Sequence, residues 1–323
     1  MEYRSLGRSG LRVSTIGLGC NNFGRSNTLT ATQEGTTAVV DAAIESGITL
    51  FDTADIYGAE RGLSESLMGV ALRGGKREKI VLATKFGMDM DGANGPDWEA
   101  RGSRRYIRLA VEASLRRLQT DWIDLYQLHR PDPLTPVEET IAALDELVTE
   151  GKVRYLGHSN LAGWQVVEAE YLAQLRGHTR FISAQSEYSL LERSVEAEVL
   201  PAVNAYGLGF LPFFPLYNGL LTGKFTRDGG GPADSRIMTI RPHLVENAPW
   251  DAIERYAAFC ADRGVSMLTA TFTWLLAQPG LTSVIAGTTR PEQVVQNADA
   301  AGSWQATPAE IAEISAIFSD PAS

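Results

Sequence analysis

The chain is poor in residues that cross-link a fold or bind metals. Its 323 residues contain two cysteines, Cys20 and Cys260, and four histidines. Two cysteines cannot form a disulfide framework, and they are expected to fill space in the core. No second His or Cys gives metal-ligand spacing, so the sequence predicts no metal site.

Long apolar runs and blocks of positive charge are also missing. The richest apolar stretch, residues 207–217, is interrupted by Pro212 and Pro215 and is shorter than the roughly 20 residues that cross a bilayer. The start, MEYRSLGRSG, lacks the apolar segment of a secretory signal. With 29 Lys and Arg against 39 Asp and Glu, the net charge is −10, which argues against nucleic acid or a membrane as partner. We expect a soluble cytoplasmic protein, whose oligomeric state the sequence leaves open.

Short apolar runs alternate along the chain with longer amphipathic ones. The runs predict strands near residues 13–18, 49–52, 80–84, 123–128, 153–158, 181–185, 209–213 and 283–285. Most are continuously apolar, as parallel strands covered on both faces are. Eight strands alternating with helices favour an α/β fold of the (β/α)8 TIM barrel type, with residues 1–323 as a single domain. An open doubly wound sheet is the alternative, but no Gly-x-Gly-x-x-Gly follows a strand.

Three segments fall outside this alternation. Residues 1–13 predict an N-terminal β-hairpin that could close the bottom of the barrel. Residues 217–249, after the seventh strand, show little pattern and predict a long loop over the cofactor or substrate. Residues 302–323 predict a C-terminal helix and tail.

Two of the expected helices start with a capping signature. Thr135 and Thr307 each supply a hydroxyl, a proline follows at the first helical position, and a glutamate returns three residues later. We therefore expect one helix to begin after Thr135 and end at Gly151, and another to begin after Thr307.

Polar residues follow three neighbouring strands. Asp52 and then Tyr57 follow the second strand, Lys85 follows the third, and His129 follows the fourth. The carboxyl ends of barrel strands open on one face, so these side chains should converge there. An adjacent ammonium lowers the pKa of a tyrosine from about 10, Asp52 would orient that ammonium, and a neutral His129 can donate to a carbonyl oxygen. The four predict an acid–base site around a carbonyl group.

Each of the four also has a plainer interpretation when taken alone. Asp52 could cap a turn, Tyr57 could pack within its loop, and His129 could be a solvated loop residue. Lys85 is harder to explain in this way, because a lysine without a role at the end of a buried strand would lie further into solvent. Their occurrence at successive strand ends favours the shared site.

At these residues the sequence resembles the aldo-keto reductases over nearly its whole length. FDTADIYG (51–58) and ALDELVTEGKVRYLGHSN (143–160) resemble the two signatures of that family, and LATKFG (82–87) and LYQLHRPD (125–132) resemble its lysine and histidine segments. The resemblance implies a (β/α)8 barrel that reduces a small-molecule carbonyl substrate with NADPH. It also implies that Tyr57, Lys85, Asp52 and His129 are the catalytic tetrad, with Tyr57 as the general acid.

The resemblance further implies where the cofactor binds, with NADPH favoured over NADH. Ser159, Asn160 and Gln185 match the residues that hold the nicotinamide carboxamide, and Phe213 matches the aromatic that stacks on the ring. The other implied cofactor residues are Pro215, Leu216, Gly219, Leu221 and Lys224 near the pyrophosphate, and Gly287, Thr288, Thr289, Arg290, Gln293 and Asn297 near the adenosine end. At this helix start, Arg290 and the two threonines can bind a 2′-phosphate. Without the resemblance, the segment reads as a capped surface helix.

The substrate is less well defined than the reaction. The candidate pocket walls are mostly apolar or aromatic, namely Asn22, Phe23, Met88, Trp98, Phe214 and Tyr217. Phe214 stands where many relatives have a small hydroxyl residue. Two other functions are kept as alternatives, an NAD-dependent aldose dehydrogenase and an NADPH-binding regulatory or sensor subunit such as some ion channels carry.

Overall fold

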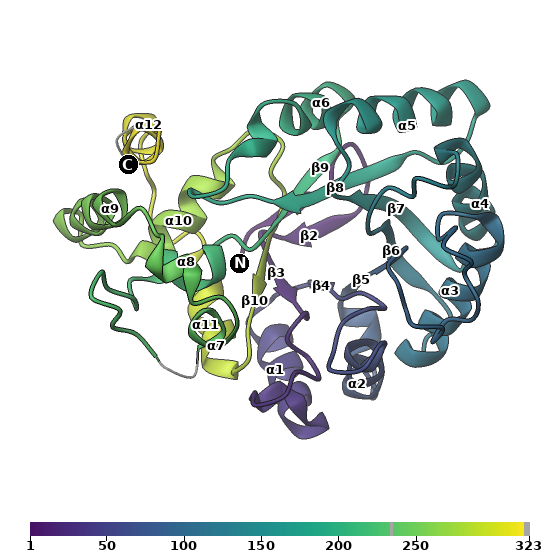
Figure 1. Cartoon of the computed structure of the whole chain (residues 1–323), viewed down its shortest axis with the longest axis horizontal. Coiled ribbons are helices and arrows are strands. Elements are labelled where there is room, and N and C mark those ends of the chain that lie inside the picture. The colour runs from purple at the N-terminus through teal and green to yellow at the C-terminus, as the bar shows by residue number, and fades with distance from the viewer. Residues whose placement is uncertain (233–234, 320–323) are drawn as a thin grey trace.

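Eight parallel strands form the centre of the molecule (Figure 1). The computed structural model describes residues 1–232 and 235–319. The strands are β3 (Ile16–Gly19), β4 (Leu50–Asp52), β5 (Val81–Phe86), β6 (Ile123–Leu128), β7 (Val153–Ser159), β8 (Phe181–Glu187), β9 (Gly209–Phe213) and β10 (Val284–Gly287). Their spatial order is β10-β3-β4-β5-β6-β7-β8-β9, and all neighbours are parallel. β9 and β10 stand at the two ends of this spatial order. A bridge between Phe210 in β9 and Leu281, which comes shortly before β10, brings these ends together, so the predicted (β/α)8 barrel is confirmed.

Helices surround this barrel on the outside (Figure 1). They are α1 (Gln33–Glu45), α2 (Leu63–Ala71), α3 (Arg104–Leu118), α4 (Val137–Thr149), α5 (Gly163–Arg176), α6 (Val199–Tyr206), α9 (Trp250–Asp262), α10 (Met267–Leu276), α11 (Pro291–Ala300) and α12 (Pro308–Ile317). Short 3-10 helices are η1 (Leu29–Ala31), η2 (Arg77–Lys79) and η3 (Ser194–Glu196). The main apolar core lies between these helices and the strands. In the described part of the chain, none of the helices combines the length and apolar character needed to traverse a bilayer.

A hairpin plugs the amino-terminal end of the barrel. β1 (Tyr3–Ser5) pairs antiparallel with β2 (Arg12–Ser14), which confirms the predicted N-terminal hairpin. Leu6 and Val13 are fully buried and form a second core inside the barrel with residues from five of its strands, Leu50, Ala83, Leu125, Leu211 and Ile285. Because apolar side chains fill this end, the opposite end is left for polar chemistry.

The third strand of the barrel runs further than the sequence predicts. β5 continues to Phe86 instead of ending at residue 84, so Lys85 lies within the strand and not after it. Lys85 is opposite Gln127 in the ladder between β5 and β6. Both side chains are fully buried and polar, so they interrupt the apolar run from which strands are predicted.

One of the two predicted helix caps is wrong and the other is confirmed. The Thr135 hydroxyl donates to Asp132 Oδ2 at 2.7 Å, and α4 has Pro136 as its N-cap with no side-chain hydrogen bond. The donated hydrogen bond orients the hydroxyl toward a charged acceptor, and its oxygen forms no capping bond with the N–H groups of α4. At α12, Thr307 Oγ1 accepts from the Glu310 N–H at 3.3 Å, and the Glu310 carboxylate accepts from the Thr307 N–H at 2.8 Å.

The segment after β9 has more regular structure than its sequence indicates. It contains η4 (Tyr217–Thr222), α7 (Arg236–Ile240) and α8 (His243–Glu246). Residues 233–234 of the predicted 217–249 loop and residues 320–323 of the predicted C-terminal tail lie outside the described residues.

Candidate active site

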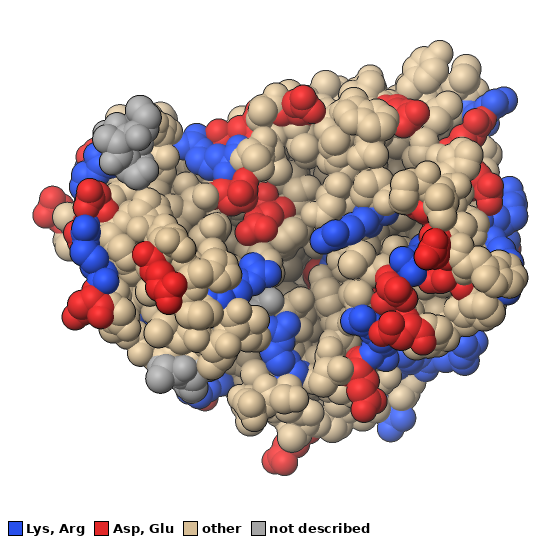
Figure 2. Space-filling view, viewed as in Figure 1, with Lys and Arg blue, Asp and Glu red and all other residues tan. Residues whose placement is uncertain are grey.

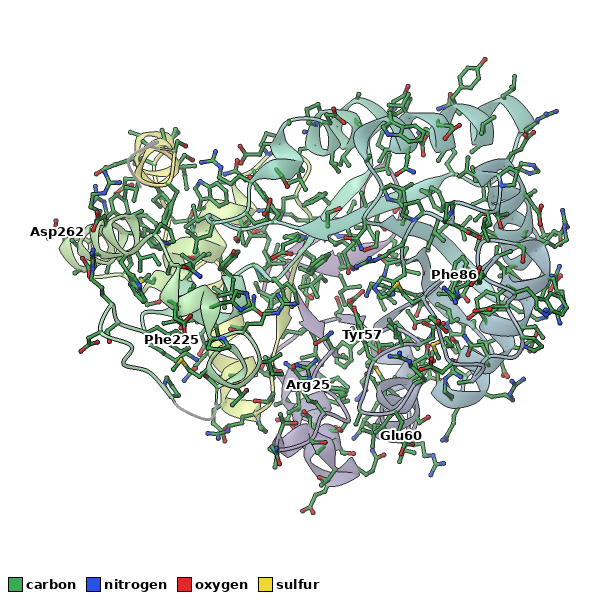
Figure 3. The ribbon with its side chains drawn as sticks, in the orientation of Figure 1. Arg25, Tyr57, Glu60, Phe86, Phe225 and Asp262 are labelled. Carbon is green, nitrogen blue, oxygen red and sulfur yellow. The ribbon has the colours of Figure 1, made fainter. Side chains whose placement is uncertain are left out.

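The four candidate catalytic side chains meet at the carboxyl-terminal end of the barrel. Asp52 ends β4, Lys85 lies near the end of β5, and His129 directly follows β6. Tyr57 lies in the loop after β4, where its N–H donates to Ala54 O at 3.2 Å. Figure 3 shows Tyr57 near the centre of the barrel mouth.

Lys85 joins the other members of this group. Its side chain is 0% exposed, and Nζ donates to Asp52 Oδ2 at 2.6 Å, to Thr53 O at 2.9 Å and to Tyr57 Oη at 3.4 Å. The three donors of one ammonium are therefore all used. This geometry fixes the lysine between the carboxylate and the phenol.

The other carboxylate oxygen of Asp52 is held by two amides. Gln127 Nε2 donates to Asp52 Oδ1 at 3.1 Å, and Gln185 Nε2 donates to the same atom at 2.9 Å. From the sequence, Gln185 is expected at the cofactor, and Gln127 is not among the predicted site residues. The sequence does contain a signal for Gln127. It is a polar residue within a largely apolar strand, and it lies two positions before His129, a spacing that puts two side chains on the same side of an extended chain.

Burial decides the acidity of the phenol. Burial raises the pKa of Tyr57 above its ordinary value, and the lowering effect of the Lys85 ammonium does not cancel it. Lys85 lowers the pKa of Tyr57 as expected, but the net shift is upward because the effect of burial is larger. Burial lowers the pKa of Lys85, but Asp52 and Tyr57 together raise it by a larger amount, so the net shift is upward. At neutral pH the pair consists of a neutral phenol and an ammonium.

His129 lies next to Tyr57. The two rings are edge to face, with centroids 5.8 Å apart. Burial, together with the positive charges of Lys85 and Arg130, lowers the pKa of His129 well below its ordinary value. The imidazole is therefore neutral and can donate one ring N–H to a polar atom beside Tyr57.

A cavity opens above these side chains, visible as the hollow in the middle of the face shown in Figure 2. Its volume is about 1240 Å³, and Asp52, Tyr57 and His129 form part of its wall. Pockets for one drug-sized molecule typically measure about 300–1,000 Å³. The cavity is thus large enough for two ligands, one of them beside Tyr57.

Most of the predicted cofactor residues line this cavity. They are Asn160, Gln185, Phe213, Pro215, Leu216, Gly219, Lys224, Gly287, Thr288, Thr289, Arg290, Gln293 and Asn297. Ser159 is buried behind Asn160 and accepts from its side-chain amide at 2.9 Å. Leu221 is fully buried in the apolar core and is not part of the wall.

Asn160 has an unusual backbone conformation and links neighbouring strands to His129. Asn160 has a φ of 60°, a left-handed conformation that Asn tolerates better than most residues. Its N–H donates to Gln185 O at 2.9 Å, and its amide nitrogen donates to His129 O at 3.0 Å. Asn160 therefore ties the ends of β7 and β8 to the histidine.

The residues predicted to form the substrate pocket are dispersed. Asn22 and Phe214 line the cavity, whereas Phe23 is 0% exposed and belongs to the apolar core. Trp98 is 70% exposed, with the Arg105 guanidinium 4.1 Å above its ring. Met88 and Tyr217 are partly exposed and do not contribute to the cavity wall.

The comparison with known proteins agrees with this geometry. The profile described as the aldo/keto reductase family matches residues 15–318. The chain belongs to the aldo/keto reductase family. Members of this family bind NAD(P)H, and the chain is accordingly an NAD(P)H-dependent oxidoreductase whose reaction is carbonyl reduction.

Several curated relatives match almost the whole chain. It is 41% identical over 301 residues to the uncharacterized oxidoreductase YrpG of Bacillus subtilis, and the match spans 91% of this chain and 89% of that protein. It is 32% identical over 334 residues to L-glyceraldehyde 3-phosphate reductase of Escherichia coli K12, with coverages of 99% and 93%. It is 35% identical over 306 residues to a probable voltage-gated potassium channel subunit beta of Oryza sativa subsp. japonica, with coverages of 92% and 90%.

The cavity fits the dinucleotide that the family uses. Several residues of its wall have buried polar atoms without a hydrogen-bond partner in the described part of the chain, namely Arg25, His129, Asn218, Ser235 and Thr288. A buried polar atom without a partner costs free energy, so atoms of this kind around one cavity indicate a polar ligand. Next to Thr288, the Thr289 N–H already donates to Gln293 Oε1 at 2.9 Å, which orders the start of α11. For a metal there is no comparable indication, since the described residues contain no group of three or more His, Cys, Asp or Glu suited to one.

Proposed function

We propose that the protein reduces an aldehyde or ketone to an alcohol with NADPH and that Tyr57 donates the proton. The observation that carries this proposal is the partly buried phenol of Tyr57, with Lys85 Nζ at 3.4 Å and a large cavity in front of it. The cofactor, when bound, supplies a hydride to the carbonyl carbon.

The residues of the chain handle the proton and the developing negative charge. As the carbonyl oxygen becomes negative, Tyr57 gives it the phenolic proton, and the Lys85 ammonium stabilises the phenolate that remains. Asp52 keeps that ammonium in place from 2.6 Å. The neutral His129 donates an N–H to the same carbonyl oxygen and orients it. Water then reprotonates Tyr57.

The cofactor residues are assigned by the family resemblance and by their position on the cavity wall. Phe213 would stack on the nicotinamide, with Asn160 and Gln185 at its carboxamide. Lys224 and Arg290 would bind phosphate groups, because both carry positive charge on the wall of the cavity. Arg290 follows β10 and precedes α11, a position where a 2′-phosphate would also meet the helix N–H groups. This is the reason for favouring NADPH over NADH.

Replacing the phenol tests the role of Tyr57. We expect Tyr57→Phe to lower kcat for aldehyde reduction by at least a hundredfold, because general acid catalysis typically contributes about 10²–10⁴-fold. Binding of NADPH, followed by its fluorescence, should persist. Tyr126→Phe is the matched control, since Tyr126 is a fully buried tyrosine outside the cavity wall. Retention of wild-type turnover by Tyr57→Phe would remove the assignment.

The choice of cofactor needs a separate measurement. We expect kcat/KM to favour NADPH over NADH, and we expect Arg290→Ala to reduce that preference by weakening the binding of the 2′-phosphate. A preference for NAD(H) that Arg290→Ala leaves unchanged, together with faster oxidation of aldoses than reduction of aldehydes, would favour the NAD-dependent aldose dehydrogenase.

A second candidate function follows from one of the relatives. The similarity to a probable potassium channel subunit favours an NADPH-binding regulatory or sensor subunit as the alternative. That function predicts tight binding of NADPH, negligible turnover on a broad panel of carbonyl compounds, and co-purification of a membrane partner.

A further inference from the structure

The cavity has the opposite charge to the chain as a whole. The chain carries a net charge of −10, yet the charged residues of the cavity wall, within the described part of the chain, are four cations, Arg25, Arg130, Lys224 and Arg290, and one anion, Asp52. That anion is already paired with Lys85. Clefts that carry one sign of charge concentrate ligands of the other sign. Lys224 and Arg290 are assigned to the cofactor above, which leaves Arg25 and Arg130. Of these two, Arg25 has a buried guanidinium nitrogen without a hydrogen-bond partner among the described residues.

The backbone around Arg25 is held by hydrogen bonds on both sides. The Arg25 N–H donates to Asn22 O at 3.2 Å, and Arg25 O accepts from Thr28 Oγ1 at 2.8 Å. Next to it, Gly24 N–H donates to Thr30 O at 2.8 Å. The arginine is therefore presented from an ordered loop between β3 and α1, so little backbone entropy would be lost when it binds a ligand.

The same loop is attached to the loop that carries Tyr57. Gly24 O accepts from the Ala59 N–H at 3.0 Å, two residues beyond Tyr57. Arg25 and Tyr57 both line the cavity at the mouth of the barrel, and Figure 3 labels both side chains. A ligand whose carbonyl oxygen lies at Tyr57 can thus reach Arg25 with another part of the molecule.

The guanidinium of Arg25 is incompletely bonded. Nη2 donates to Asn21 Oδ1 at 3.2 Å, whereas Nη1 is buried and has no hydrogen-bond partner among the described residues. No described carboxylate forms an ion pair with Arg25. An arginine that lines a cavity, lacks an anionic partner and has a buried N–H group without an acceptor is suited to a carboxylate or phosphate, which it can bind through two N–H groups.

A second guanidinium, that of Arg241, lies next to a residue of the cavity wall, Phe214. Burial and the positive charge of Arg241 both lower the pKa of Arg25, so the two cations repel one another. Arg241 stands over the ring of Phe214, 5.3 Å from its centroid, and Phe214 is part of the cavity wall. Glu187 also lies in the field of Arg241, but no ion pair within 4 Å joins them in the described residues. An anion between the two arginines would relieve their repulsion.

We propose that Arg25, assisted by Arg241, binds a carboxylate or phosphate group on the carbonyl substrate, so that the preferred substrates are anionic aldehydes or ketones. This assignment rests on the proposed carbonyl reduction, since it concerns the same cavity. The anion could also be a phosphate of the cofactor, and the experiment separates the two sources.

The test compares two aldehydes of similar size, 4-oxobutanoate and butanal. We expect wild-type kcat/KM to be at least tenfold higher for 4-oxobutanoate, and we expect Arg25→Gln to reduce that ratio at least tenfold. Arg25→Lys, which keeps the charge, should recover part of the ratio. Arg61→Gln is the matched control, because Arg61 follows Tyr57 in the same loop but is exposed and pairs with Asp91 at 3.0 Å. It should change the ratio less than twofold.

Other outcomes would overturn the assignment to the substrate. A wild-type ratio near one would refute it and leave the proposed reduction standing. A rise in the KM for NADPH in Arg25→Gln, equal with both aldehydes and without a change in ratio, would place the anion on the cofactor instead.

A binding measurement covers the case in which no aldehyde is reduced, which would contradict the proposed function itself. Titration of succinate into the NADP⁺-loaded protein, followed by calorimetry, should show binding that Arg25→Gln or Arg241→Gln weakens at least tenfold. Equal succinate binding by wild type and both variants would refute the anion site whatever the turnover.

Discussion

Removing the Lys85 ammonium should destabilise the protein as well as inactivate it. Lys85 Nζ lies 2.6 Å from Asp52 Oδ2, with the two side chains 0% and 4% exposed. Loss of one partner from a buried ion pair typically costs about 3–5 kcal/mol, because it leaves the other charge buried without compensation. In Lys85→Met the Asp52 carboxylate keeps the amide donors of Gln127 and Gln185. We therefore expect a loss near the lower limit, about 3 kcal/mol.

A double variant separates the effect of charge from that of packing. Asp52→Asn combined with Lys85→Met removes both charges, so no uncompensated ion remains in the barrel. We expect the double variant to regain about 2 kcal/mol of the free energy of unfolding lost in Lys85→Met. It should remain inactive, because Tyr57 then lacks the ammonium that stabilises its phenolate.

Urea denaturation at neutral pH, followed by tryptophan fluorescence and circular dichroism, measures these differences, provided that the m-values agree. Lys152→Met is the control, since Lys152 pairs with Glu112 at 2.7 Å but is 32% exposed. An exposed pair of this kind contributes at most about 1 kcal/mol. A Lys85→Met variant as stable as wild type would refute the buried ion pair. A double variant no more stable than Lys85→Met would show that the loss comes from packing.

Two further predictions concern pH. The pKa of Tyr57 is raised by burial, and that of His129 is well below its ordinary value. We therefore expect kcat for reduction to stay level from pH 6 to pH 8 and to fall only in alkaline solution, as Tyr57 loses its proton. An inflection of kcat near pH 6.5 would contradict the neutral imidazole. Burial lowers the pKa of His158 to about 3, against about 6.5 in the unfolded chain, so its contribution to stability is complete above pH 6.5 and is lost as the pH falls toward 3. At pH 5 the loss is about 2 kcal/mol, and urea denaturation at pH 7.5 and pH 5 should show it in wild type but not in His158→Leu.

The barrel could be predicted because its strands are buried on both faces. Continuous apolar runs between amphipathic helices are typical of parallel strands, and the hairpin with its Gly-rich turn carries its own local signal. The prediction failed where polar side chains enter the barrel, as at Lys85 in β5. It also failed at Thr135, whose hydroxyl is bound by the side chain of Asp132.

The candidate site was likewise predictable in part. The order of polar residues after successive strands predicted that Asp52, Tyr57, Lys85 and His129 converge, since strand order alone brings strand ends to one face. The direction of the Tyr57 pKa shift could not be predicted in this way, because it depends on the balance between burial and one nearby ammonium. Phe23, expected in the pocket wall, is instead part of the core, because loop conformation decides where such a side chain lies.

The amino-acid sequence by itself determined the alternation of strands and helices, and with it the end of the barrel where the polar residues gather. The reason is that the hydrophobic period of each segment and the order of the strands follow directly from successive stretches of the chain. Only the tertiary structure decided which polar groups lose their water, which donors share the Asp52 carboxylate, and that Arg25 approaches Arg241 from a segment more than two hundred residues away. Desolvation and charge pairing depend on distances between side chains that are remote in sequence, and folding alone sets those distances.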